Sequence, residues 1–204
     1  MDYTTIPSAD SIARTVAALE ARNIHVHLVA TKEAALAKIQ ELIPKGKEVM
    51  SGGSTTLDQI GYTDFLKSEA HPWHNVKDAI VAETDPVAQT ALRVKSISSE
   101  YFLGSVHAIA QTGEVVIASA TGSQIAPYAF SSPHIIWVAG AQKIVPTLQD
   151  AFDRIHSHVF PLEDARMKKT GAQGSVIGMM LVFERLILPH RTMDLVLVNE
   201  PLGF

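Results

Sequence analysis

The residues best suited to chemistry form one continuous turn, Gly52-Gly53-Ser54-Thr55-Thr56. The apolar Val49-Met50 before it and the hydroxyl side chains after it are typical of a buried strand, a tight turn and a helix start. Glycine allows a close backbone approach, and hydroxyls with unpaired N–H groups at a helix start attract phosphate or carboxylate. We therefore predict an anion-binding turn, the alternative being an ordinary serine-capped turn. The turn matches neither a Walker loop nor a GxGxxG turn.

A second turn of small residues, Thr121-Gly122-Ser123, follows the apolar segment Glu114–Ala118. In parallel α/β sheets, ligands bind beyond the carboxyl ends of the strands. If the strands before the two turns are neighbours, both turns face one cleft. We expect the second turn to close the other side of a small anionic ligand.

Apolar segments that alternate with amphipathic helices must position these turns. We predict an α/β fold with a mainly parallel sheet flanked by helices, ending in an antiparallel strand pair. It forms one domain over residues 1–204, with the helix and strand of residues 1–30 packing on the core. The segments are a helix with Ile12, Val16 and Leu19, a strand at Ile24–Val29, a helix from Thr31 to Pro44, strands at Tyr101–Ser105, Glu114–Ala118 and His134–Ala139, a helix at Pro146–Val159, and a closing hairpin of Val176–Phe183 and Met193–Val198 around Pro189-His190-Arg191.

Composition limits the classes of function. The 204 residues, 47% apolar and 19% charged, are enough for one globular domain with a full core. A net charge of -4 without a basic run argues against nucleic acid as the main partner. The chain has no cysteine, which excludes disulfides, a thiol nucleophile and thiolate ligands within it. No signal peptide or membrane span is evident, so we expect a cytoplasmic protein.

Four blocks of the sequence are distinctive in this order: Ser51–Gly61 (SGGSTTLDQIG), Tyr101–Val116 (YFLGSVHAIAQTGEVV), Trp137–Pro146 (WVAGAQKIVP) and Leu197–Phe204 (LVNEPLGF). Together they resemble the LUD domain of lactate-utilization proteins, of the lactate-utilization protein C type. The resemblance implies the fold shared by glucosamine-phosphate isomerases, ribose-phosphate isomerases and CoA transferases, which bind phosphorylated sugars or acyl-CoA at glycine-rich strand ends. It also implies a role in lactate or related organic-acid utilization beside iron-sulfur oxidation subunits.

The chain departs from its relatives where catalytic acids would lie. Ribose-phosphate isomerases carry acids where this chain has Gly104-Ser105-Val106-His107, so pentose isomerisation is not expected, and Gln111 replaces an acid common in related LUD domains. Gly104 and Ser105 are instead candidates for ligand contact. Glu114 and His107 are the candidate catalytic groups, since a carboxylate or a near-neutral imidazole can transfer protons; Glu100 is a further acid. Each has a plain alternative, a solvated strand-end acid or a hydrogen-bonded histidine.

Lys143 follows a predicted strand and could neutralise an anion or face solvent; the pattern favours solvent. His25 and His27 lie on one face of a predicted strand, but no third ligand is evident, so we predict no metal site and no cofactor.

Two functions stay open. The chain is either an enzyme or enzyme component that handles a small anionic metabolite, or a non-catalytic subunit that relies on a partner with redox centres. The lack of cysteine favours the second function for electron transfer. The C-terminal apolar strands could also contribute to a homodimer contact.

Overall fold

The centre of the fold is a parallel sheet whose strands are covered on both faces. The computed structural model describes residues 1–68 and 70–204, and in these residues six parallel strands pair in the order β1-β10-β7-β4-β2-β3. Continuous apolar runs are typical of such doubly covered strands. The strands are β1 (His25–Val29), β2 (Glu48–Ser51), β3 (His74–Asn75), β4 (Tyr101–Ser105), β7 (His134–Gly140) and β10 (Thr192–Val198).

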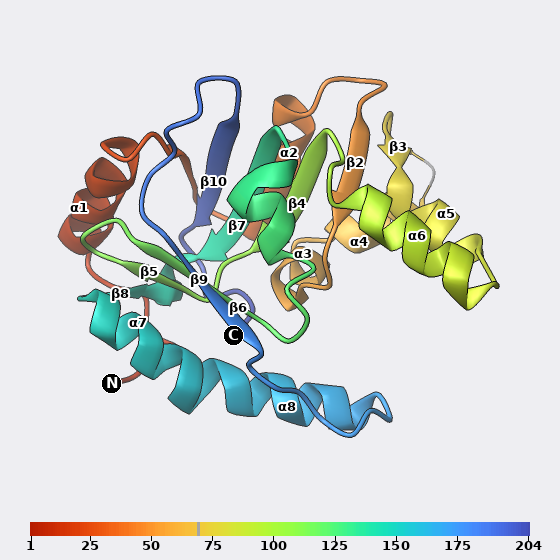
Figure 1. Cartoon of the computed structure of the whole chain (residues 1–204). Coiled ribbons are helices and arrows are strands. Elements are labelled where there is room, and N and C mark those ends of the chain that lie inside the picture. Colours follow the sequence, from red (N-terminus) through yellow and green to blue (C-terminus); the bar gives the residue numbers. More distant parts are fainter. Residues whose placement is uncertain (69) are drawn as a thin grey trace.

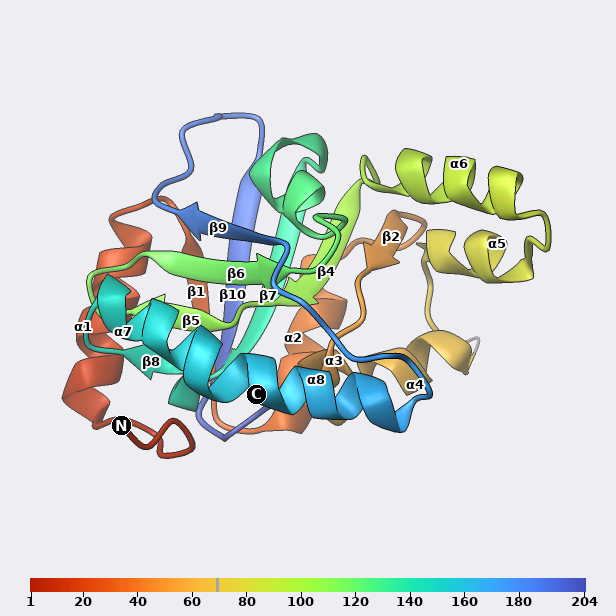
Figure 2. The same cartoon turned by 60° about the horizontal axis from the view of Figure 1, so that its bottom comes forward.

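A smaller sheet lies against one face of the large one, and its strands run across those of the large sheet (Figure 2). Its order is β8-β5-β6-β9, in which β5 pairs antiparallel with β6, β6 pairs antiparallel with β9, and β5 pairs parallel with β8. The strands are β5 (Ala108–Ala110), β6 (Val115–Ser119), β8 (Ile144–Val145) and β9 (Met179–Phe183).

Helices complete the layers (Figure 1). None of them, within the described part of the chain, combines the length and apolar content needed to cross a bilayer. They are α1 (Ala9–Glu20), α2 (Lys32–Leu42), α3 (Thr55–Gln59), α4 (Tyr62–Lys67), α5 (Val76–Ala82), α6 (Pro86–Ser96), α7 (Leu148–Arg154) and α8 (Phe160–Lys169), with the π-helices η1 (Pro127–Ser131) and η3 (Ile155–Val159) and the 3-10 helix η2 (Ala141–Lys143).

Three apolar clusters hold these layers together. One lies between the two sheets and includes Trp137 of the large sheet and Ile117 of the small one. The second packs α2, α3 and α4 on the opposite face of the large sheet, and the third packs α7 and η3 on the small sheet. The small sheet is therefore buried between the large sheet and the long helix α7–η3–α8.

The predicted α/β class with a mainly parallel sheet is confirmed, and several boundaries have clear chemical causes. Asn23 ends α1 in the left-handed conformation, at a φ of 62°. Thr31 caps α2 by accepting from the Ala34 N–H, and Thr147 and Asp150 form a capping box at the start of α7. Strand β4 occupies the predicted residues 101–105.

The helix predicted at residues 146–159 is longer than expected. It begins at Leu148, passes through the π-helical η3 and continues as α8 to Lys169, into a stretch that its polar composition assigned to no element. Pro161 has no N–H to donate to the carbonyl four residues earlier, as an α-helix requires. The π turn before it bonds residues five positions apart, so the helix continues through the proline. This continuation brings α8 beside the functional cavity described below.

The two C-terminal apolar runs do not pair with each other as predicted. An antiparallel pair does involve the C-terminal region, but it joins β9 to β6 at the edge of the small sheet. Strand β10 lies between β1 and β7 and is parallel to both. The burial explains the difference, because β10 is covered on both faces as a central parallel strand must be, whereas β9 is half-buried.

Arg191, predicted in the turn of that hairpin, is instead a buried cation. It donates to the carbonyl oxygens of Pro127, Tyr128, Ala129 and Ser132 at 2.9–3.1 Å. These carbonyls belong to η1 and the residue after it, so Arg191 satisfies helix-end acceptors that would otherwise be buried without a donor. It thereby joins the start of β10 to η1.

We expect Arg191→Met to lower the free energy of unfolding by roughly 2–4 kcal/mol, because several buried carbonyls lose their donors. Urea denaturation measures this, with Arg185→Met, an exposed arginine nearby, as the control. Equal stability of the two variants would show that the Arg191 bonds contribute little.

Candidate functional site

The two predicted turns lie side by side, although the strands before them are not neighbours: the first turn follows β2 of the large sheet and the second follows β6 of the small sheet. The Gln124 side chain, from the second turn, donates to the Gly53 carbonyl oxygen at 3.2 Å. Between the turns and the long helix lies a cavity of about 240 Å³. It is lined by residues 53–56 after β2, 105–107 after β4, 118–121 and 123–124 at the end of β6, Lys143, five residues of η3 and α8, residues 175–177, and Phe204.

Lys143 lies at the floor of this cavity and is 3% exposed. Its amine donates to Ser105 Oγ at 3.0 Å, to Thr56 Oγ1 at 3.1 Å and to the Val106 carbonyl at 3.1 Å. The preference for solvent expected from the sequence is therefore wrong. Burial, together with the nearby charge of Arg154, lowers the Lys143 pKa to about 7, so the amine can be charged or neutral near neutral pH.

His107 also lines the cavity, but as a neutral ring. Its Nδ1 accepts from the Ala118 N–H at 3.1 Å, which leaves the ring hydrogen on Nε2. Burial and the charges of Lys143 and Arg154 lower the His107 pKa to about 3. His107 can therefore donate a hydrogen bond to a ligand, but an imidazole of such low pKa does not take up protons near neutral pH.

Arg154 lies directly behind the cavity and is fully buried. Its Nη1 donates to the backbone oxygens of His107 and of Phe204, the last residue of the sequence, and both residues line the cavity. Its Nε and Nη2 have no hydrogen-bond partner in the described part of the chain, although its guanidinium lies 5.7 Å from the centre of the Tyr3 ring. Burial lowers the Arg154 pKa to about 10, which leaves it charged at neutral pH.

Helix α8 supplies a charged pair on the opposite wall. Arg166 donates two bonds of 2.7 Å to the Glu163 carboxylate, from Nε and from Nη2. Apolar side chains of η3 and of residues 176–177 complete this wall. The cavity therefore has a polar floor, an apolar side and, at Glu163, one carboxylate that a guanidinium already binds.

Most of the predicted ligand-binding residues line the cavity, but three glycines do not. Gly52 packs against the Gln124 side chain and borders a second cavity of about 190 Å³. Gly104 makes room for Tyr128, whose hydroxyl would lie 1.7 Å from a Cβ at that position. Gly122 turns the chain at a φ of 79° beside Met179. The predicted residues that do line the cavity are Gly53, Ser54, Thr55, Thr56, Ser105, His107, Thr121, Ser123 and Lys143.

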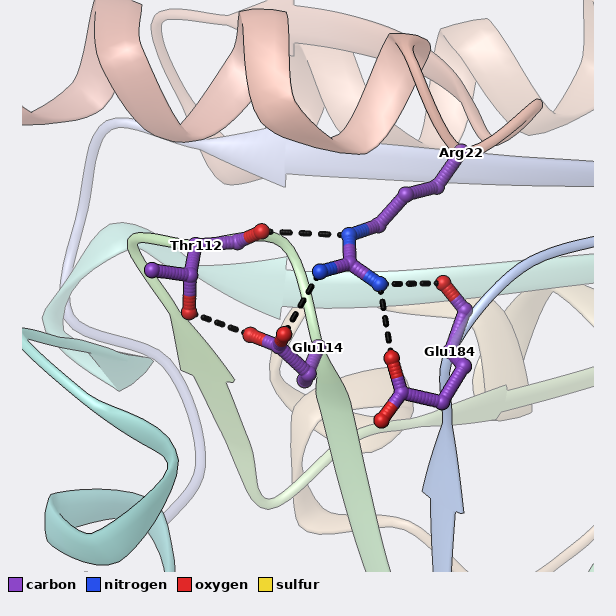
Figure 3. Close-up of polar contacts among 4 residues, drawn as sticks. All are labelled: Arg22, Thr112, Glu114 and Glu184. Atoms are coloured by element: carbon purple, nitrogen blue, oxygen red, sulfur yellow. Dashed lines mark hydrogen bonds and ion pairs between the residues drawn. The ribbon is translucent and has the colours of Figure 1, made fainter.

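Glu114 is at the other end of β6 from the cavity, in a polar cluster with Arg22 (Figure 3). Arg22 Nη2 lies 2.5 Å from the Glu114 carboxylate, and Nη1 lies 2.8 Å from that of Glu184. Burial opposes ionisation of Glu114, but bonds from Thr112 and from its own N–H, and the Arg22 charge, outweigh it and lower the pKa. Glu114 thus links α1 to the small sheet, and Glu100 pairs similarly with Lys47 on the surface.

Several lining residues escaped the sequence analysis. Gln124 lies one position beyond the predicted turn, and Arg166 and Glu163 lie in the unassigned polar stretch, although their i, i+3 spacing is a signal for a helix. Arg154 offered another signal, a charge within an apolar helical pattern. Away from the cavity, His27 Nε2 lies 2.8 Å from Asp194, as expected of a satisfied histidine.

We expect Glu114→Gln to lower the free energy of unfolding by about 1–2 kcal/mol at neutral pH, because charge-assisted bonds are lost. The folded-state pKa is lowered, so this contribution is present above the unfolded pKa of about 4 and is lost as pH falls through the folded value. Urea denaturation at neutral and acid pH tests this, with Glu184→Gln, whose side chain is 63% exposed, as the weaker control. A difference that persists in acid would contradict the ion-pair account.

Comparison with known proteins supports the resemblance noted in the sequence. The family described as LUD domain matches residues 12–179. Similar solved structures include a DUF162 family protein from Deinococcus radiodurans, with a TM-score of 0.55 and 10% identity over 96% of this chain and 100% of that one. Another is eIF2B beta from Chaetomium thermophilum, with a TM-score of 0.39 and 13% identity over 58% of this chain and 44% of that one. No curated protein matches. The match over most of its length shows that the chain belongs to the LUD-domain family.

Proposed function

We propose that this LUD-domain protein binds a small anionic metabolite in the cavity above Lys143, and that it takes part in lactate or related organic-acid utilization. One observation carries the proposal. Lys143 is buried at the floor of the cavity, and no aspartate or glutamate among the described residues is buried with it. A buried cation without a counter-charge is costly, and an anion in the cavity would supply that charge.

The glycine turn supports the same ligand class. The N–H groups of residues 53–56 have no hydrogen-bond partner among the described residues, and all four residues line the cavity. Helix α3 has only five residues, so its dipole contributes little. We therefore assign the attraction for the anion mainly to Lys143 and to individual N–H and O–H donors.

The cavity also limits the ligand's size and shape. A volume of about 240 Å³ is small beside the roughly 300–1,000 Å³ of pockets that hold drug-sized ligands. The floor offers the amine and hydroxyls, whereas Ile155, Val159 and Ile177 give the side wall an apolar surface. A short carboxylate or a small phosphorylated compound fits this combination of polar and apolar contacts.

A thermal-shift panel of lactate, pyruvate, inorganic phosphate and sugar phosphates tests the proposal. A ligand at a hundred times its Kd adds about 2.7 kcal/mol, or roughly 5–10 °C in Tm for a chain of this size. We expect a shift in the wild type and in Lys45→Met, an exposed-lysine control, and its loss in Lys143→Met. No shift with any anion would contradict the proposal and favour the accessory-subunit role, for which co-purification with an iron-sulfur protein is the direct test.

The affinity for the anion should fall as pH rises above about 7. The charged form of Lys143 attracts the anion, and burial already lowers its pKa to about 7 in the free protein, so a growing fraction is neutral at higher pH. We expect up to about a tenfold loss of affinity per pH unit and uptake of a proton on binding. Calorimetry in buffers of different ionisation enthalpy measures both, and binding without proton uptake would exclude Lys143 as the responsive group.

A further inference from the structure

We infer that Ser105 is a nucleophile and Lys143 its general base, so that the cavity transfers or hydrolyses an acyl group presented as an ester. The inference rests on the proposed site but assigns it a reaction. Ser105 Oγ and Lys143 Nζ are 3.0 Å apart, within the range expected of a nucleophile and its base. Pairs of serine and lysine replace the serine-histidine pair in several unrelated hydrolases.

The contacts around the amine fit a neutral base as well as a cation. A neutral amine has two N–H donors and one lone pair. The donors are satisfied by Thr56 Oγ1 and the Val106 carbonyl, both at 3.1 Å, and the lone pair is then free to accept the Ser105 hydroxyl proton. In the neutral state that a general base requires, both N–H donors and the lone pair of the Lys143 nitrogen therefore have a partner.

Ser105 is the hydroxyl best placed to react. Its side chain is half-buried and lines the cavity, whereas Thr56 is buried and Ser54 Oγ accepts the Leu57 N–H as the cap of α3. Ser105 ends strand β4, where its backbone is in register with Val138 of β7; β2 pairs with β4 only as far as Leu103. The Ser105 hydroxyl lies 3.1 Å from Thr56 Oγ1, and this contact holds the side chain beside the first residues of α3.

The reaction balances with groups already present. Ser105 Oγ attacks the ester carbonyl while Lys143 takes the hydroxyl proton, and the N–H groups of residues 53–56 can stabilise the negative oxygen. The C–O bond of the ester breaks, and the leaving alkoxide takes the proton from Lys143. Water, activated by the same amine, then hydrolyses the acyl-serine to the free acid and restores Ser105. The acid released is a small carboxylate, the class of ligand that the cavity was proposed to bind.

The charged groups around Lys143 are consistent with titration near neutral pH. Arg154 of α7 and Arg166 of α8 are positive, whereas Glu163 of α8 is the one acidic side chain among the described lining residues and is bound to Arg166. His107 is neutral. The surroundings thus favour loss of the Lys143 proton, while a bound anion favours its retention. Binding of an anion and activation of Ser105 should respond to pH in opposite directions.

Labelling with a fluorophosphonate tests the inference. Ser105 Oγ displaces fluoride, a P–O bond forms as P–F breaks, and the proton passes through Lys143 to water. We expect an adduct that peptide mass spectrometry locates on Ser105, absent in Ser105→Ala and formed about a hundredfold or more slowly in Lys143→Met. The rate should rise with pH to a plateau above about 7. Ser157→Ala and Lys45→Met, away from the cavity, should label like the wild type.

Lys143→Arg keeps the positive charge but removes the base, and thermal denaturation shows whether each variant is folded. We expect this variant to retain the anion-dependent Tm shift and to lose labelling. Absence of an adduct on Ser105 in the wild type would overturn the inference, as would labelling of folded Lys143→Met or Lys143→Arg at the wild-type rate, or a rate independent of pH. An intact anion-dependent shift without labelling would overturn the reaction alone, whereas the absence of both would overturn the proposed function as well.

Discussion

The arrangement of the site depends on the burial of a single amine. Lys143 lies where the chain leaves β7 of the large sheet and enters β8 of the small one. Its three partners come from the turn after β2 and from the end of β4. One nitrogen therefore ties together the ends of three neighbouring strands of the large sheet and the entry to the small one. The desolvation cost of the amine is offset only if all three partners are in place, so the cavity floor has one well-defined arrangement.

Part of this arrangement could be predicted from local signals. Strand β4 and the glycine turn were evident because apolar runs and turn residues act over a few positions. The neighbouring position of the two turns does not follow from the rule for parallel sheets, because β6, which precedes the second turn, lies in the small sheet and pairs antiparallel with both of its neighbours. The burial of Lys143 does not follow from local signals either, because its partners lie 37 to 87 positions away in the sequence. In the sequence, a lysine after a strand has the same local pattern whether its amine contacts water or hydroxyl groups of distant residues.

The position of β10 shows a second limit of local signals. Its sequence and that of β9 are both short apolar runs, and such runs fit an edge hairpin as well as two separate sheets. The two strands differ in burial, because β10 is covered by α2 on one face and by the core between the two sheets on the other. The long helix was underestimated for a related reason. Beyond Pro161 its residues are mostly polar, and this composition does not indicate that one side of α8 faces the cavity.

Close backbone contacts complete the enclosure of the amine. Gly203 lies so near that a Cβ there would be 2.2 Å from Thr56 Oγ1 and 3.1 Å from Lys143 Nζ, and its φ of 66° suits glycine. Gly140 similarly meets the carbonyl oxygen of Glu200. Residues 202–204 therefore cover the amine, and Phe204 reaches the cavity wall.

Three cations are buried in the described part of the fold, and they differ in how their donors are satisfied. This difference separates a structural role from a functional one. Arg191 donates four bonds to helix-end carbonyls and needs nothing more. Lys143 has three partners but no negative charge beside it, and Arg154 keeps two donors without partners among the described residues. If Lys143 and Arg154 were only structural, apolar residues of similar volume would stabilise the fold at least as well. Their concentration beside one small cavity is therefore best explained by the chemistry of what enters it.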